Sequence, residues 1–447
     1  MTPGTAIRRA VAWSGGPASA GFIRSPMARG YLILTGSSAV TRLMSFLAAV
    51  ILARELGPAG FGEFSLFFAV MMLLSQATGF VDSAFVRYAN TVRLEDRRAY
   101  LRASLTLKVG FCLALLLAAL PAGSLISRAL DKPELDLVLA LAVICAVALN
   151  FLTLQAAVYQ AAERFAAFAA LNALFPVLSL AGVLMGTAVG SSVSGPRDTS
   201  LVYVIYLSAA TVVGAISGWG LVRLTKPLAT TEWSIVKRLV SFSKWLIADN
   251  VVYLTVQRLD LLIVAGLADP TGLGRYAAAQ RIAVMGALLT GTLSALLLPR
   301  ASRTRGSPAA TRRYLVQAGL ISVLLSAMIA ALWLAIPFLV NGLFGPGYAG
   351  AIPITRIILL GTLCIAVYTP LSRLFFAEDR PRRIFYLQVV RLTAMVALAF
   401  LLVPRAGAAG IAWAVAGTEF FALLYTGGAI RQVLRTQAAD ERSRQAR

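Results

Sequence analysis

Long apolar stretches of helical length recur along the whole chain and are separated by short polar joints. A membrane-spanning helix needs about 20 apolar residues, and backbone groups in lipid must bond within the segment, so each stretch predicts a helix. None of the stretches alternates between apolar and polar residues as barrel strands do. The twelve predicted spans are residues 30–53, 61–86, 103–127, 135–160, 167–190, 201–222, 245–267, 274–299, 315–340, 351–376, 384–403 and 409–430.

Composition supports an all-α polytopic membrane protein. Of the 447 residues, 59% are hydrophobic and only 13% are charged, whereas soluble domains are nearer half apolar and a quarter charged. Residues 1–29 are basic and rich in Gly and Pro, so we expect a disordered tail, and the first apolar run is too long for a signal peptide. Cys112, Cys145 and Cys364 lie in apolar spans without metal-ligand spacing, which predicts packing residues and neither a metal nor a cofactor.

The positive charge is distributed by loop. The net charge is +22, and with a cytoplasmic N-terminus 29 of the 41 Lys and Arg residues fall on the cytoplasmic side against 6 on the opposite side. This positive-inside asymmetry predicts an even number of spans and two cytoplasmic termini. The basic loops would lie against anionic head groups, so the basicity does not require a nucleic-acid partner.

One corner of the chain occurs twice. At an offset of 212 residues, "PAGFGEF" (Pro58–Phe64) aligns with "PTGLGRY" (Pro270–Tyr276) as P-x-G-x-G-x-aromatic. Pro ends the preceding span, and the glycines permit a sharp reversal. With six spans per copy, the halves should be related by an axis along the membrane normal, as in many transporters.

The repeat predicts a domain organisation with a cleft between two lobes. The predicted parts are the N-terminal lobe at 30–223, a cytoplasmic interfacial linker at 224–244, the C-terminal lobe at 245–431 and a cytoplasmic tail at 432–447. The basic, aromatic character of 224–244 favours a helix lying at the membrane surface. A plain linker is the alternative for this segment.

Several charged residues lie within the predicted spans. The basic ones are Arg42, Lys108, Arg258, Arg281, Arg356 and Arg391, and the acidic ones are Asp249, Asp260 and Glu419. A charge at the bilayer centre costs about 2.5–3.5 kcal/mol on insertion scales, so such residues face a cavity or a partner. Helical spacing places Thr35, Ser38, Arg42 and Ser45 on one face of the first span, and Asp249, Tyr253, Gln257 and Asp260 on one face of the seventh.

These arginines predict a cationic cavity. Arg42, Arg258 and Arg281 would line it, with Arg391 as a fourth member and Arg87 at the cytoplasmic mouth. Guanidinium groups stay charged and grip phosphate oxygens bidentately, so a lipid-linked diphosphate is a fitting ligand. The alternative is that the arginines pair with the embedded acids and hold the bundle together.

The remaining embedded charges have plainer interpretations. Asp249, Asp260 and Glu419 would bind a coupling cation or form structural salt bridges, and Arg391 with Glu419 would be a simple interhelical pair. Lys108 and Arg356 lie near span ends, where we expect their side chains to extend to the interface.

Three stretches of the chain carry a resemblance to a known family: "RLMSFLAAVILARELGPAGFGEFSLFFAVMMLLS", "VDSAFVRYAN" and "RLDLLIVAGLADPTGLGRYAAAQRI". They resemble the Wzx-type flippases of the polysaccharide-biosynthesis family, in the multidrug/oligosaccharidyl-lipid/polysaccharide (MOP) exporter superfamily. The resemblance implies two six-helix bundles in a V around a central cationic cavity. It also implies alternating-access transfer of an undecaprenyl-diphosphate-linked oligosaccharide across the bacterial inner membrane, with Arg42, Arg258 and Arg281 placed to serve. The implied partners are that glycan, membrane lipids, and polymerase and export machinery.

Other functions fit the sequence less well. A drug or small-molecule antiporter of the same superfamily would favour acids in the N-terminal lobe, whereas the clearest embedded acids lie in the C-terminal half. A glycan polymerase or ligase would need a sizeable outer loop, and the outer loops here are short. No Gly is followed by Lys, so the P-loop pattern of an ATPase is absent.

Overall fold

The computed structural model describes residues 26–93, 96–129, 134–190, 199–225, 232–267, 269–295, 297, 308–377 and 381–445. All regular secondary structure in these residues is helical, which confirms the predicted all-α fold. In the same residues, eight helical stretches are long and apolar enough to cross a membrane, and Gly36–Ala89 and Tyr386–Gln432 are each long enough to cross twice. With the helices Trp233–Leu267 (α9) and Pro270–Ala295 (α10) added, this arrangement accommodates the twelve predicted spans.

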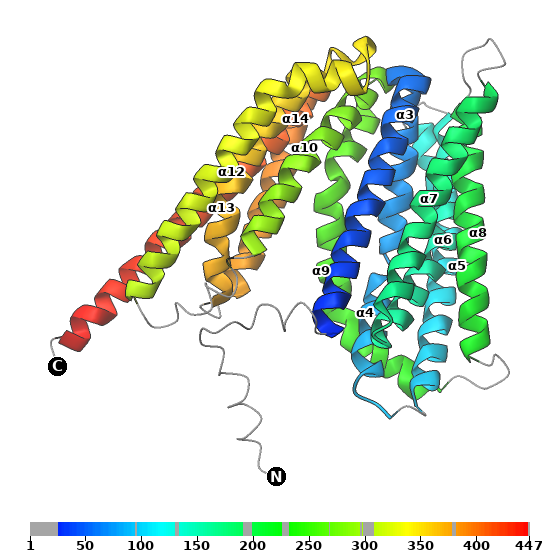
Figure 1. Ribbon diagram of the computed structural model, residues 1–447, viewed down its shortest axis with the longest axis horizontal. Coiled ribbons are helices and arrows are strands. Elements are labelled where there is room, and N and C mark those ends of the chain that lie inside the picture. Colours follow the sequence, from blue (N-terminus) through cyan, green and yellow to red (C-terminus); the bar gives the residue numbers. More distant parts are fainter. Residues whose placement is uncertain are drawn as a thin grey trace.

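The helices form two lobes (Figure 1). The N-terminal lobe contains α3 (Pro26–Gln76), α4 (Gly79–Ala89), α5 (Arg97–Ala129), α6 (Glu134–Ala161), α7 (Phe165–Gly190) and α8 (Thr199–Thr225). The C-terminal lobe contains α9 (Trp233–Leu267), α10 (Pro270–Ala295), α12 (Pro308–Leu343), the 3-10 turn η2 (Pro346–Tyr348), α13 (Ala351–Ala377) and α14 (Pro381–Gln445).

The two longest helices are each interrupted at one glycine. Gly57 in α3 has φ 67° and Gly407 in α14 has φ 51°, so the backbone leaves the helical region at both positions. Glycine tolerates positive φ because it has no Cβ. Pro58 follows the first interruption directly, as the sequence pattern predicts for the corner between the first two spans.

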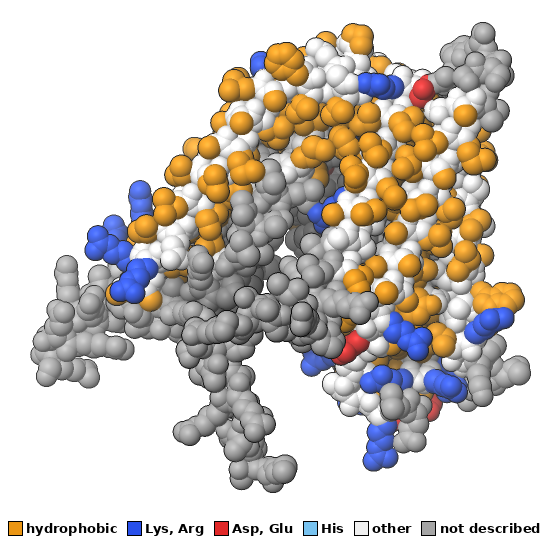
Figure 2. Space-filling model, viewed as in Figure 1, with side chains coloured by type: hydrophobic (Ala, Val, Ile, Leu, Met, Phe, Trp, Pro, Cys, Tyr) orange, Lys and Arg blue, Asp and Glu red, His pale blue; other side chains and the backbone are white. Residues whose placement is uncertain are grey.

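The lobes converge at one end of the molecule and diverge toward the other (Figure 1). At the converging end, here called the closed end, the corner after Gly57 packs against the start of α10. At the diverging end, here called the open end, α3 begins and α14 ends (Figure 1). Figure 2 shows apolar side chains over the middle of both lobes and Lys and Arg side chains gathered toward the open end.

Helix α9 packs against both lobes. Its first turns place Val236 and Leu239 in a core cluster with Phe85 and Leu101 of the N-terminal lobe. Its last turns pack into the main core, and α9 also contacts α14. The helix therefore begins at Trp233, inside the segment expected to lie at the membrane surface, and continues without a break through the seventh span.

Candidate substrate site between the lobes

The first half of α3 is largely unpacked. Between Gly36 and Leu47 every described side chain is exposed or half-buried, and burial begins at Ala48. A Cβ added at Gly36 would meet no atom within 4 Å. This half of α3 starts at the open end, where the lobes diverge (Figure 1).

The first half of α3 has two different faces. Ser38, Arg42 and Ser45 share one side of the helix, and the exposed apolar residues Val40, Leu43 and Leu47 follow the other. The serine hydroxyls bond back to helix carbonyls, Ser38 to Leu34 at 2.8 Å and Ser45 to Thr41 at 3.0 Å. The Arg42 guanidinium is exposed. Such a helix fits the border between a water-filled gap and lipid.

Arg281 reaches from one lobe into the other. It lies on α10, and its Cζ atom is 4.9 Å from the centroid of the Phe68 ring on α3. Together with Ser45, Ser179 and Tyr206 of the N-terminal lobe it lines a small cavity of about 10 Å³. Since Ser45 is one helical turn from Arg42, the structure brings the surroundings of Arg42 and Arg281 together at the junction of the lobes.

Arg391 and Glu419 form an ion pair inside the C-terminal lobe. The Nη2 atom of Arg391 lies 2.6 Å from Glu419 Oε1, and the two side chains are 22% and 5% exposed. Tyr368 donates a second hydrogen bond to Glu419 Oε2 at 2.7 Å. The pair joins the two halves of α14 to α13, as the structural interpretation of these two residues predicts, and a role of Arg391 in substrate binding stays a prediction.

Asp260 is a buried hydrogen-bond acceptor beside that pair. Its Oδ2 atom accepts from the Tyr276 hydroxyl at 2.6 Å and from Gln280 Nε2 at 2.7 Å, and its Oδ1 atom accepts from the Leu261 N–H at 2.8 Å. Asp260, Arg391 and Glu419 all line one cavity of about 180 Å³. The carboxylate thus ties the last turns of α9 to the start of α10.

Of the remaining predicted site residues, the structure describes the side chain of Arg87 alone. Arg87 is exposed in the last turn of α4, toward the open end. Asp249 and Arg258 belong to α9, but their side chains lie outside the described part of the structure. Their proposed roles therefore stay predictions.

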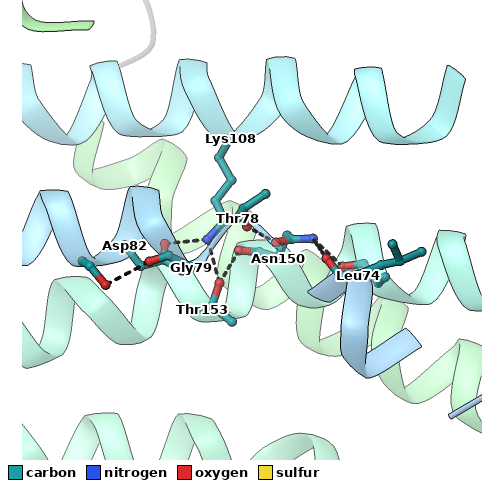
Figure 3. Close-up of polar contacts among 9 residues, drawn as sticks. Leu74, Thr78, Gly79, Asp82, Lys108, Asn150 and Thr153 are labelled. Atoms are coloured by element: carbon teal, nitrogen blue, oxygen red, sulfur yellow. Dashed lines mark hydrogen bonds and ion pairs between the residues drawn. The ribbon is translucent and has the colours of Figure 1, made fainter. Parts of the chain in front are cut away.

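The expectation for Lys108 is wrong. The residue is fully buried, and its Nζ atom donates to Asp82 Oδ1 at 2.5 Å and to Thr153 Oγ1 at 2.6 Å (Figure 3). These partners come from α4 and α6, whereas Lys108 lies on α5. A membrane interior favours an ammonium group that is paired over one that is alone, so the side chain turns inward and does not extend to the interface.

A polar network around Asn150 was missed by the sequence analysis. Thr78, at the break between α3 and α4, donates its hydroxyl to the Asn150 Oδ1 atom. Asn150 Nδ2 donates to the Leu74 carbonyl at 3.4 Å and to the Ala146 carbonyl at 2.9 Å (Figure 3). A helix break in lipid frees backbone carbonyls that need donors. The sequence feature that could have predicted this network is Asn150 itself, a polar residue within an apolar span.

The amino-acid sequence matches the model of a known protein family. The family model described as "Polysaccharide biosynthesis protein" matches residues 27–305, which is more than half of the chain. The chain belongs to the polysaccharide biosynthesis protein family. No protein in a search of curated sequences matches it significantly.

Solved structures with the same fold are transporters. The lipid II flippase MurJ in an inward closed conformation is 14% identical with a TM-score of 0.72, over 90% of this chain and 87% of that one. An inward-facing multidrug-resistance MATE transporter of the MOP superfamily is 14% identical with a TM-score of 0.72, over 89% and 96%. An outward-facing MATE transporter is 13% identical with a TM-score of 0.58, over 92% and 95%. This member of the polysaccharide biosynthesis family is thus a multi-pass membrane protein with a two-lobed transporter fold.

Proposed function

We propose that the chain is a flippase that moves an undecaprenyl-diphosphate-linked oligosaccharide across the bacterial inner membrane by alternating access. The glycan would serve the biosynthesis of O-antigen, capsule or exopolysaccharide. The open end would face the cytoplasm, since the Lys and Arg residues gather there (Figure 2). Both termini would then be cytoplasmic.

The two-faced first half of α3 carries this proposal. A lipid-linked diphosphate has a charged, hydrated head and an apolar tail, so its binding site must offer water and lipid side by side. Arg42 with its serine neighbours provides the polar face, and Val40, Leu43 and Leu47 provide the apolar face. An exposed guanidinium on a membrane helix is costly unless it faces water or an anion.

Arg281 adds a second cation from the opposite lobe. Its guanidinium packs on Phe68 of α3 and lines the same small cavity as Ser45, which is one helical turn from Arg42. A diphosphate carries several oxygens, and two guanidinium groups from different lobes would hold it from both sides. A substrate held in this way would bias the lobes toward one arrangement, as alternating access needs.

The test uses arginine variants in a strain that lacks the chromosomal copy. We expect Arg42→Ala and Arg281→Ala to abolish polymer export and to accumulate lipid-linked oligosaccharide, while the protein level stays normal. Arg42→Lys should retain part of the export, because charge is kept and the bidentate geometry is lost. The matched control is Arg405→Ala, which removes an exposed arginine that does not line the Arg281 cavity.

Wild-type export by both alanine variants would overturn the proposal. Export of small drugs without any accumulation of a lipid-linked intermediate would favour the antiporter alternative. Flipping should also be reproduced with the purified protein in liposomes that contain an undecaprenyl-diphosphate glycan.

A further inference from the structure

The two copies of the repeated corner contact each other through their second glycines. A Cβ added at Gly62 would overlap the carbonyl oxygen of Pro270 and lie 2.9 Å from the Gly274 nitrogen. A Cβ added at Gly274 would overlap the carbonyl oxygen of Pro58 and lie 3.0 Å from the Gly62 nitrogen. The contact is reciprocal, so backbone packs on backbone between the lobes.

The first glycines of the same motifs face their own lobes. A Cβ at Gly60 would lie 3.1 Å from side-chain atoms of Leu56 and Thr199, both in the N-terminal lobe. At Gly272 it would lie 2.8 Å from the Asp269 carboxylate and 3.7 Å from Ala408, both in the C-terminal lobe. Each motif therefore has one glycine for its own corner and one for the opposite lobe.

Side-chain contacts across the lobes surround the glycine pair. Arg54 of α3 donates through Nε to the Leu343 carbonyl at 2.7 Å and through Nη2 to the Gly342 carbonyl, at the C-terminal end of α12. In return, the Tyr348 hydroxyl donates to the Ala53 carbonyl at 2.9 Å. The buried Phe61 ring packs against Tyr348, with centroids 6.2 Å apart.

The Gly62–Gly274 contact and the contacts of Arg54, Tyr348 and Phe61 join opposite lobes at the closed end, so they must break if that end opens. We propose that Gly62 and Gly274 are the closing contact of an outer gate and set the balance between the two arrangements of the lobes. This proposal rests on the alternating access of the proposed function. A Cβ at either position cannot fit while the lobes touch, because the nearest atoms that it would meet all belong to the opposite lobe. Substitution therefore penalises the closed arrangement alone.

The experiment measures the distance between the outer ends of the lobes. Spin labels are attached at Arg128→Cys and Arg405→Cys, exposed positions in the N-terminal and C-terminal lobes, after the three natural cysteines are replaced by Ala. Double electron–electron resonance (DEER), which measures the distance between two spin labels, is recorded on the full-length protein in nanodiscs without substrate. In Gly62→Ala and Gly274→Ala we expect the ratio of long to short distances to rise by about tenfold or more over the unsubstituted labelled protein.

Gly272→Ala is the matched control within the same motif. Its added methyl group faces a flexible Asp269 side chain in its own lobe, so the distance distribution should stay as in the labelled parent. An unchanged distribution in Gly274→Ala would overturn the proposal. Failure of both glycine variants to fold would overturn it too, because the contact would then serve assembly of the lobes.

A milder variant provides an independent test. Tyr348→Phe removes only the hydroxyl that bonds to Ala53, and we expect it to shift the distances in the same direction as the glycine variants. An unchanged distribution in Tyr348→Phe would count against a gate at this end. These measurements need no substrate, so they test the gate separately from the proposed function. If the gate opens but the protein does not flip lipid-linked glycans, the proposed function is refuted and the gate proposal stands.

Discussion

The Lys108 Nζ atom lies 2.5 Å from the Asp82 Oδ1 atom, in the interior of the N-terminal lobe. The same ammonium group donates to Thr153, so one side chain of α5 joins α4 and α6 (Figure 3). Its aliphatic stem is buried as well. This pair fixes the position of α4, the short helix that carries Arg87 to the open end.

Breaking this ion pair on one side should destabilise the protein. We expect Lys108→Met to cost about 3–5 kcal/mol, because the Asp82 carboxylate is left buried without its cation. The double variant K108M/D82L should recover much of the loss, since both charges are then gone. Thermal unfolding of purified protein in detergent measures the effect. The control Lys237→Met removes an exposed lysine, and an equal loss there would contradict the assignment.

The Asn150 network should stabilise the folded protein more than an ordinary intrahelical hydrogen bond does. Asn150→Ala leaves the Leu74 carbonyl and the Thr78 hydroxyl without their partner, and each buried unsatisfied group costs about 1–3 kcal/mol. Asn172→Ala is the matched control, because Asn172 bonds to Phe168 of its own helix at 2.8 Å. Thermal unfolding should separate the two variants, and equal midpoints would show that the network does not stabilise the helix break.

The Arg391–Glu419 pair should affect stability before it affects transport. Arg391→Met leaves a carboxylate that is 5% exposed without its cation, for which we expect a loss of about 3–5 kcal/mol. Adding Glu419→Gln should restore stability and export together. If the double variant is stable but does not export, Arg391 or Glu419 acts on substrate or on a coupling ion.

Variants of Phe68 and Arg281 should separate the packing of the Arg281 side chain from the effect of its charge. Phe68→Leu removes the ring beneath the guanidinium, and a cation–π contact is worth about 0.5–2 kcal/mol. We expect a modest fall in thermal stability with export retained. Arg281→Gln should lower stability by a similar amount and abolish export, since the cation itself is lost. Export lost equally in both variants would mean that Arg281 acts through its packing on α3.

Much of the fold was predictable because the solvent imposes it. Helical length and apolar composition in each span follow from the bilayer, and the structure confirms an all-α protein with two lobes. The stretches around Pro58 and Pro270 resembled the polysaccharide-biosynthesis family, and the family comparison confirms that membership. What the motif did not reveal is that its two copies pack against each other.

The site was harder to predict, and Lys108 shows why. A position near the start of a predicted span suggested a side chain that extends to the interface, but its partners Asp82 and Thr153 belong to other helices. Arg391 and Glu419 were recognised as either site residues or a structural pair, and spacing alone did not decide between them. The ion pair at 2.6 Å places them together in the lobe interior.

The sequence by itself determined the membrane environment, the helical class, the duplicated corner and the two-faced first span, because hydropathy and helical periodicity act along one segment at a time. Only the tertiary structure decided which buried charges meet one another, that Arg281 crosses to Phe68, and that Gly62 meets the second corner. Those contacts depend on the distances and rotations between helices, which result from packing many side chains at once and leave no periodic trace in any single helix.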